Sequence, residues 1–316
     1  MPAVLTHDFF GQDAFGSALS AVDLSTPDER DAFLLGNQGP DPLFYIRVVP
    51  AFGEFAKLGE DMHHVPPSAL LCTLWRALDD LPQEQQALGR AYLAGFVCHY
   101  LLDRTMHPFV YFWERGLCSA GVDGLEPSDA GIVHSEIERD LDEMVLFAKR
   151  NQTVAVYRPY ECVLKGSDQM LDVVGSLYYP LVAEAVGEQE PTLSHVFPLA
   201  VSCFRIVQRL FWSPKQRKSA VLGRLEHPVL HTRYSLVQAM SHRVRETPTS
   251  DFDNSERRPW RDPFANVVRT ESFWDLYQQA LDQVPQTLSA VFCDGFDETL
   301  AHEVTGGINF CGERVE

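Results

Sequence analysis

Histidine and aspartate side chains recur at four-residue intervals within one apolar stretch of the chain. Residues 95–108 read GFVCHYLLDRTMHP, which places His99, Asp103 and His107 four positions apart. Residues at this spacing lie one above another on the same face of an α-helix. Burying an unpaired carboxylate is expensive, and a cation would neutralise it. The spacing therefore indicates a metal site on an apolar helix, with a helix face that simply meets solvent as the equal alternative.

A second pair with the same spacing, His134 and Glu138, lies in the amphipathic stretch IVHSEIERDLDEMVLFAKR. Apolar residues such as Ile137 and Leu141 cover the neighbouring face of the predicted helix. Runs of charge on a helix are typical of a face in contact with solvent. The remaining charged residues of this stretch are predicted to form such a face: Glu136, Arg139, Asp140, Asp142 and Glu143.

Three more candidate ligands lie closer to the N-terminus. His7 follows a threonine in THDFFG, and Asp41 stands between two prolines in GNQGPDPLFY. An isolated Asp beside proline more often caps its own turn, so Asp41 has a structural interpretation as well. His63 and His64 are adjacent, and at most one of them can point inward from a helix.

Together these residues form a ligand set of nitrogen and oxygen atoms without a thiolate. The candidates are His7, Asp41, His63 (or His64), His99, Asp103, His107, His134 and Glu138. This chemistry favours zinc, with iron or manganese as alternatives. The set is too large for one tetrahedral ion, whereas two or three ions that share a carboxylate would use all of it. A close pair of ions is the usual arrangement for phosphoester hydrolysis.

The elements that must position these residues are predicted to be helices throughout, because no strand pattern is long enough to support a sheet. Helices are expected at residues 68–81, 84–102, 132–150, 161–188, 193–212 and 273–292. Pro108 follows His107, which predicts that the central helix ends near His107. Residues 1–150 are predicted to form the metal-binding catalytic core. Residues 151–316 would continue the same domain or form a helical extension, with a long loop or linker at 250–262 and a poorly patterned last two dozen residues.

Composition restricts the classes of function. The chain has 316 residues, 45% of them hydrophobic and 22% charged, as in ordinary globular proteins, and a net charge of −18 that repels nucleic acid and anionic membranes over long distances. No apolar run is long enough to span a membrane, and the N-terminus lacks a secretory pattern, so a cytoplasmic location is expected. The seven dispersed cysteines are expected to be reduced.

Five motifs in order resemble the bacterial zinc-dependent phospholipase C family, which is related to fungal zinc nucleases that act on single strands. They are THDFFG, GNQGPDPLFY, LGEDMH, GFVCHYLLDRTMHP and HSEIERDLD. The resemblance covers roughly residues 1–150 and implies an α-helical fold with a trinuclear zinc site in a cleft. It also implies that His63, rather than His64, is the ligand.

Carried over residue by residue, the resemblance assigns the ligands to three ions. Asp41, His63, His99 and Asp103 would hold one ion of a close pair, and Asp103 would bridge to its partner. His7 and the N-terminus, Met1 or Pro2, would hold that partner ion. The third ion would be bound by the set His107, His134 and Glu138. Asp41 would also orient or deprotonate the nucleophile. Two departures stand out: the family's mature N-terminal tryptophan is absent, and fewer residues separate Asp103 from His107.

These observations predict a phospholipase C-like phosphoester hydrolase that uses a metal-bound hydroxide. Its substrate would be a phospholipid or the soluble ester of a head group. A zinc nuclease or nucleotidase is the first alternative, for which stacking aromatics are candidates: Phe44, Tyr45, Phe109, Tyr111 and Trp113. A metal-stabilised helical binding protein without activity is the second. A di-iron protein is disfavoured, because only Glu60 and His63 have the Glu-x-x-His spacing among the candidates.

Overall fold

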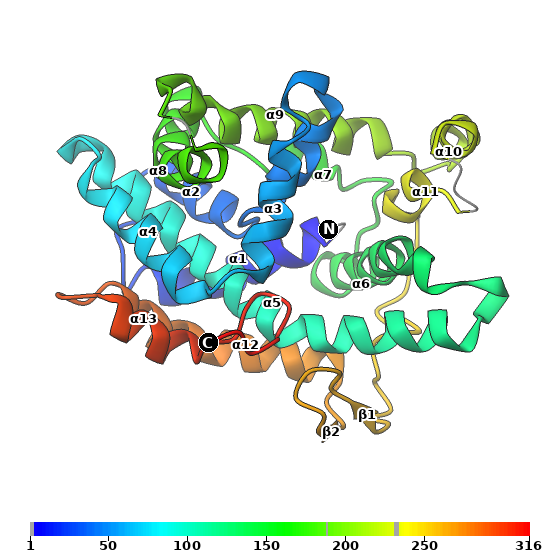
Figure 1. Ribbon diagram of the computed structural model, residues 1–316. Helices are drawn as coiled ribbons and strands as arrows, with labels where there is room; N and C mark the ends of the chain where they lie inside the picture. The colour runs from blue at the N-terminus through cyan, green and yellow to red at the C-terminus, as the bar shows by residue number, and fades with distance from the viewer. Residues whose placement is uncertain (1–2, 188, 231–233) are drawn as a thin grey trace.

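The protein is mostly helical, as the computed structural model in Figure 1 shows. The structure describes residues 3–187, 189–230 and 234–316. Its first-half helices are α1 (Val4–Ala18), α2 (Pro27–Gly36), η1 (Asp41–Val48), η2 (Pro50–Phe52), α3 (Phe55–His64), α4 (Pro67–Asp79), η3 (Gln83–Gln85), α5 (Gln86–Ala120), η4 (Val122–Gly124), η5 (Pro127–Asp129) and α6 (Ala130–Arg150). The predicted all-α class is thus confirmed at the level of helical content.

The second half continues this helical pattern with one short pair of strands. Its elements are α7 (Pro159–Cys162), α8 (Asp168–Val186), η6 (Pro191–His195), α9 (Val196–Phe211), α10 (Arg217–Leu230), α11 (Leu236–Met240), β1 (Trp260–Arg261), β2 (Val268–Arg269), α12 (Phe273–Val291) and α13 (Glu298–Thr305). β1 and β2 pair antiparallel, with Trp260 opposite Arg269. Among the described helices, none combines the length and the apolar composition that a membrane crossing requires.

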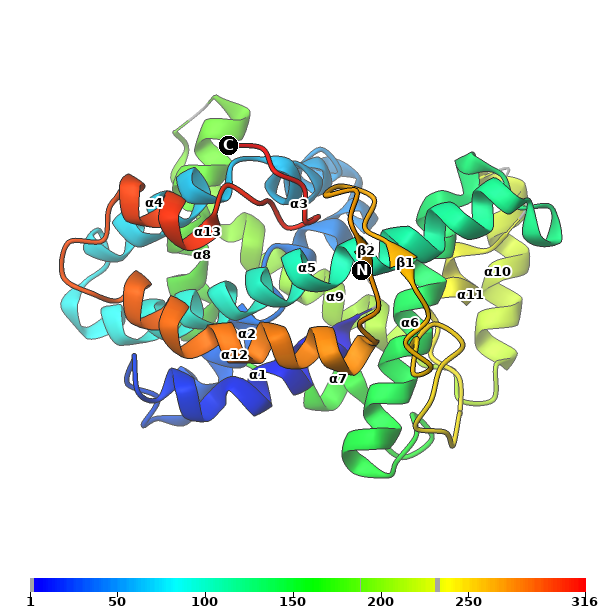
Figure 2. The ribbon, with the colours of Figure 1, turned by 90° about the horizontal axis from the view of Figure 1, so that it is seen from below.

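Helix α5 is the central element, and most of its residues between Leu88 and Val110 are buried. It packs against α2, α12, α6 and α1; Figure 2 shows α12 running alongside it. At the crossing of α5 and α2, a Cβ atom added to Gly95 would lie 2.0 Å from the carbonyl oxygen of Phe33. Only glycine permits this approach, which brings the end of α2 and the following turn against the face of α5 that carries His99.

The prediction that the central helix ends near His107 is wrong. Helix α5 continues through Pro108 to Ala120, where Gly121 closes it in the left-handed conformation with φ of 63°. A proline inside a helix costs about 3 kcal/mol because it removes one hydrogen bond. The helix continues because Phe109 and Val110, which follow the proline, are 0% and 1% exposed and pack in the core.

The predicted solvated face of α6 is also wrong for most of its residues. Arg139, Asp140, Asp142 and Glu143 are all 5% exposed or less, whereas the side chain of Glu136 is half exposed. The segment that follows α11 covers this face. Arg243 pairs with both Asp140 and Glu143, and Ser250 donates a hydrogen bond to Asp140. Sequence near α6 alone does not reveal these partners, which lie about a hundred residues later in the chain.

The C-terminal region is more ordered than the sequence suggests. The segment predicted as a long loop, residues 250–262, is anchored by Ser250 and by Trp260, which is 3% exposed and packs on the rings of Phe109 and Phe112. The last two dozen residues, predicted to lack a strong pattern, contain α13 and a tail in which Phe310 is buried. The largest group of contacting buried hydrophobic residues includes members from both 1–150 and 151–316.

Candidate metal centre

The structure brings all eight predicted ligand residues together in three groups, of which the first two share His99. These groups are His7 with Asp41 and His99, His63 with His99 and Asp103, and His107 with His134 and Glu138. Within each group the candidate ligand atoms lie within 4.8 Å of one another. All these side chains are buried apart from His134, which is partly exposed. The groups draw on α1, η1, α3, α5 and α6, so five segments meet at one place.

The carboxylate of Asp103 lies at the centre of the first two groups. Its Oδ2 is 3.2 Å from Nε2 of His99 and 3.6 Å from Nε2 of His63. Its Oδ1 is 3.2 Å from Nε2 of His7. On the far side, Nε2 of His63 is 3.3 Å from Oδ1 of Asp41. The two oxygens of Asp103 therefore face different histidines.

The third group is built in the same way around Glu138. Its Oε1 lies 3.6 Å from Nε2 of His107 and 3.3 Å from Nε2 of His134. His107 comes from α5, and the other two residues come from successive turns of α6. Because Nδ1 of His107 is also 3.8 Å from Oδ2 of Asp103, the third group adjoins the first two.

Hydrogen bonds on the outer side of the imidazoles determine which nitrogen faces inward. Nδ1 of His63 lies 2.7 Å from the carbonyl oxygen of Gly59, and Nδ1 of His107 lies 2.7 Å from that of Phe310. Nδ1 of His99 lies 3.1 Å from the carbonyl oxygen of Asn37. A carbonyl can only accept, so each Nδ1 donates, and the lone pair of each neutral ring is left on Nε2. This is the tautomer that binds a metal through Nε2.

The centre of the site consequently contains acceptors that face acceptors. Oδ1 of Asp41, Nε2 of His63, Nε2 of His99 and Oδ2 of Asp103 are fully buried, and none of them has a hydrogen-bond partner within the part of the chain that the structure describes. Buried polar atoms are normally satisfied, and an uncompensated group costs about 1–3 kcal/mol. Tetrahedral zinc with Zn–N bonds of about 2.0–2.1 Å has ligand atoms roughly 3.3 Å apart. The distances of 3.2–3.6 Å among these atoms match that spacing.

Electrostatics in the metal-free protein agree with this geometry. Burial alone would lower the pKa of His63, but Asp103 and Asp41 beside it raise that pKa to about 10. Burial also opposes charge on His134, yet Glu138 and Glu114 raise its pKa to about 9. Burial would raise the pKa of Asp103, but the neighbouring histidines hold it well below its usual range. Without an ion, protons supply the positive charge that the carboxylates require, and an ion would displace them.

Small structural features hold the ligands in place. Gly39 has φ of 50°, and a Cβ atom there would lie 2.2 Å from the ring of His99, so glycine is needed beside that ring. Between the groups lies a cavity of ≈ 20 Å³ that Thr6, His7, Asp103, His107 and Glu138 help to line. That volume is sufficient for about one water molecule.

Glu114 is a supporting residue that the sequence reasoning missed. Its Oε2 accepts a 2.9 Å hydrogen bond from Nδ1 of His134, and the residue is 7% exposed. A carboxylate behind a ligating histidine fixes the ring and makes it a better ligand. The signal in the sequence was the position of Glu114 seven residues after His107, which is two turns along the same face of α5. The predicted end of the helix at His107 concealed it.

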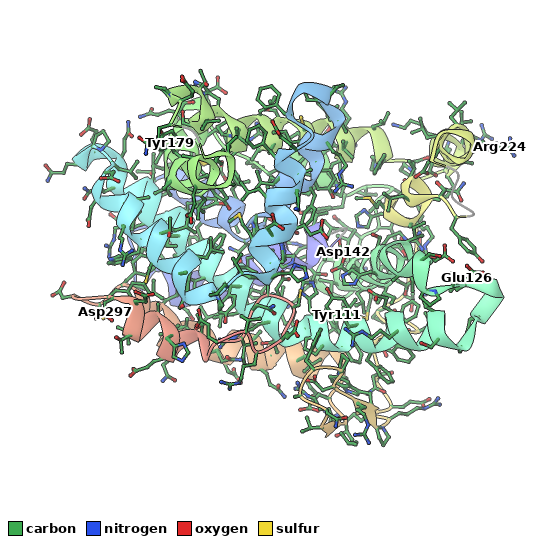
Figure 3. All side chains as sticks on the ribbon, in the orientation of Figure 1. Tyr111, Glu126, Asp142, Tyr179, Arg224 and Asp297 are labelled. Carbon is green, nitrogen blue, oxygen red and sulfur yellow. The ribbon has the colours of Figure 1, made fainter. Side chains whose placement is uncertain are left out.

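Asp142 is a second residue that the sequence reasoning missed, because it was assigned to the solvated face of α6. It is 0% exposed and lies between α6 and the start of α1, as Figure 3 shows. Its oxygens accept hydrogen bonds from the backbone N–H groups of Leu5 and Thr6 at 2.9 and 2.7 Å. A carboxylate at a helix N-terminus stabilises that end, and here it positions the helix that carries His7. His242 completes the cluster, with Nε2 3.0 Å from Asp142.

Other sequence candidates are distributed as follows. His63 is 4% exposed and faces the centre, whereas His64 is exposed, which supports the choice between them. Tyr45 and Phe109 belong to the core, while the ring of Phe44 lies 5.4 Å from that of His63 and the ring of Tyr111 lies 5.2 Å from that of His134. The predicted participation of the N-terminus concerns Met1 and Pro2, which lie outside the described residues.

Comparisons with known proteins add no relative. No protein-family model, no curated protein and no solved structure matches this chain. What is shown is a helical protein with three buried groups of histidine and carboxylate side chains that could hold metal ions.

Proposed function

We propose that the protein is a zinc-dependent phosphoester hydrolase of the phospholipase C type. The observation that carries this proposal is the convergence of buried acceptor atoms from Asp41, His63, His99 and Asp103 that find no hydrogen-bond partner among the described residues. A cation is the natural partner for such a set, and nitrogen and oxygen ligands without thiolates favour zinc. The five sequence motifs that resemble the zinc-dependent phospholipase C family provide a second, independent support.

Each group of residues has a role in this proposal. Asp103 would serve both ions of a close pair, because its two oxygens face different histidines. Asp41 is a ligand that also orients the nucleophile, and the third group, around Glu138, takes the phosphoryl end of the substrate. Divalent ions bound in these groups would lower the pKa of water, polarise the phosphoryl group and stabilise the leaving alkoxide.

The surrounding residues favour a small phosphodiester as the substrate. Asp103 and Glu138 leave the centre rich in carboxylates, which suits a substrate whose phosphate is balanced by a cationic head group. Phe44 and Tyr111 provide apolar surface beside His63 and His134. A choline phosphodiester has these properties. Stacking of a nucleobase on the same aromatic rings is the alternative that the test below separates.

The test uses the full chain loaded with zinc and two matched histidine variants. The wild-type protein is expected to hydrolyse a choline phosphodiester faster than single-stranded DNA. His63→Asn is expected to lose hydrolysis and bound zinc, whereas His64→Asn, an exposed neighbour, keeps both. Metal content is measured by elemental analysis. Zinc binding without hydrolysis of any phosphoester would instead identify a metal-stabilised binding protein, and preference for DNA would identify a nuclease.

A further inference from the structure

Positive charge is concentrated in one segment of this acidic protein. The chain carries 26 Lys and Arg against 44 Asp and Glu, yet no Asp or Glu occurs from Pro191 to Leu225. The cations of that segment all lie from Arg205 onward: Arg205, Arg209, Lys215, Arg217, Lys218 and Arg224. The segment contains α9 and the first part of α10, which lie at the edge of the molecule in Figure 1.

Helix α10 differs from a usual surface helix in the side chains that it buries and exposes. The side that packs toward α11 carries Ser219 and Gly223, which are buried, and Glu226, which accepts hydrogen bonds from the N-terminus of α11. Two of its aliphatic residues face solvent instead, with Val221 56% and Leu225 63% exposed. An amphipathic helix of a globular protein normally buries such residues.

The exposed aliphatic residues of α10 share their face with cations. Arg217, Val221 and Arg224 follow one another at helical spacing, with Lys218 and Leu225 beside them, and all five are exposed. Figure 3 shows Arg224 at the outer edge of the molecule, directed away from it. Among the described residues, none of the three cations of this face forms an ion pair. The face therefore presents positive charge and aliphatic surface together.

The end of α9 extends this surface. Nζ of Lys218 donates a 3.2 Å hydrogen bond to the carbonyl oxygen of Arg209, which brings the end of α9 against the start of α10. Arg209 is exposed, and its neighbour Leu210 is 44% exposed. Another cation and another aliphatic side chain thus adjoin the exposed face of α10.

We propose that the exposed face of α10 docks the protein on the surface of an anionic lipid bilayer. A helix with cations and aliphatic side chains on one face lies in the plane of a membrane interface, with the cations on the head groups and the aliphatic residues inserted below them. Charge complementarity identifies an anionic partner. The uncharged side chains of these five residues are aliphatic, with no aromatic ring for base stacking, which favours lipid over single-stranded nucleic acid.

The net charge of −18 does not oppose this docking at contact distance. Charges are screened over about 8 Å at physiological ionic strength, so a bound membrane senses the cations that touch it more than carboxylates that lie farther away. The proposal concerns attachment of the protein, and it holds whether or not the metal centre hydrolyses a lipid.

The experiment is co-sedimentation of the full chain with vesicles of phosphatidylcholine, alone or mixed with phosphatidylglycerol. Binding is expected only to the mixed vesicles, and it is expected to weaken as salt is added. The double variant Arg217→Gln/Arg224→Gln is expected to lower the partition constant roughly fivefold for each cation removed. Val221→Asn/Leu225→Asn is expected to lower it without changing the salt dependence.

Matched controls make the result specific to this face. Lys57→Gln/Arg76→Gln removes two exposed cations from α3 and α4, and Val156→Asn removes an aliphatic residue that is 69% exposed. Both controls are expected to bind as the wild type does, and circular dichroism checks that every variant is folded. No binding of the wild type to mixed vesicles at low salt overturns the proposal. Equal losses in the control variants, or binding to a single-stranded oligonucleotide but not to vesicles, overturn it as well.

Discussion

Two sides of helix α6 bury carboxylates, and they differ in the partners that the carboxylates find. On one side, Asp140 and Glu143 meet the guanidinium groups of Arg243 and Arg245, so the protein itself supplies the positive charge. On the other side, Glu138 lies within ion-pair distance of the imidazoles of His107 and His134. Arginine is always charged, whereas imidazole carries a positive charge only when it is protonated.

This comparison shows that burial of a carboxylate does not by itself identify a site. In an Arg–carboxylate network the charges balance without an added ion. Removal of one partner leaves a buried charge unpaired and destabilises the fold. In a His–carboxylate network whose outer nitrogens are already bonded, the histidines supply positive charge only when they are protonated, and a metal ion would supply it instead. The predictions that follow test this distinction, from the largest expected effect to the smallest.

Removal of metal should have the largest effect and should act on the histidine side alone. A ligand present at about a thousand times its dissociation constant stabilises the folded state by about 4 kcal/mol. Chelation of the zinc-loaded protein is therefore expected to lower the unfolding free energy by an amount of this order, as measured by urea denaturation. If the melting curve is the same before and after chelation, and elemental analysis finds no metal in the purified protein, the metal centre is wrong.

Arg243→Met should break the arginine side without affecting the metal. The side chain of Arg243 is 34% exposed and pairs with both Asp140 and Glu143, so its loss leaves two buried carboxylates short of charge. Breaking a fully buried pair costs about 3–5 kcal/mol, and partial exposure reduces this to about 2–3 kcal/mol. Zinc stoichiometry of the folded variant should be unchanged. Arg257→Met, which removes an exposed partner of Asp275, is the control and should cost under about 1 kcal/mol.

Glu114→Gln should weaken the third ion selectively. Loss of the carboxylate behind a ligating histidine typically reduces metal affinity about 10–100-fold. We expect that reduction for one class of ion in a competition titration with a chelator, while the ions around Asp103 bind as before. Glu136→Gln, on the exposed side of α6, serves as the control. A uniform loss of affinity for all ions would mean that Glu114 supports the fold rather than His134.

The smallest effect on stability is expected for substitution of Asp275, in the first turn of α12. It caps α12 by accepting hydrogen bonds from Ser272, whose backbone N–H and hydroxyl, together with Arg257, hold the pKa of Asp275 below its usual range. A depressed pKa stabilises the fold above the unfolded value near 3.9, and this contribution is lost as pH falls through the folded value. Asp275→Asn should therefore cost about 0.5–1 kcal/mol at pH 7. Urea denaturation at pH 7 and at lower pH should show the difference between the two proteins shrinking in acid.

Local helical geometry accounts for the part of the site that was predictable. His99, Asp103 and His107 share one face of α5, and His134 and Glu138 share one face of α6, because 3.6 residues make a turn wherever the helix forms. The same rule would have included Glu114, had Pro108 not been taken as a helix end. The proline is tolerated because the residues after it are buried, and burial is a tertiary property.

The sequence alone thus determined the helical class, the residue types of a nitrogen and oxygen metal centre and the order of ligands along two helices. Only the tertiary structure decided that His7, Asp41 and His63 reach those helices, because contacts between distant segments leave no periodic signal in the chain. It likewise decided that Asp142 holds the start of α1 and that Arg243 neutralises the other side of α6. Whether a charged residue is buried depends on which distant residue supplies its opposite charge.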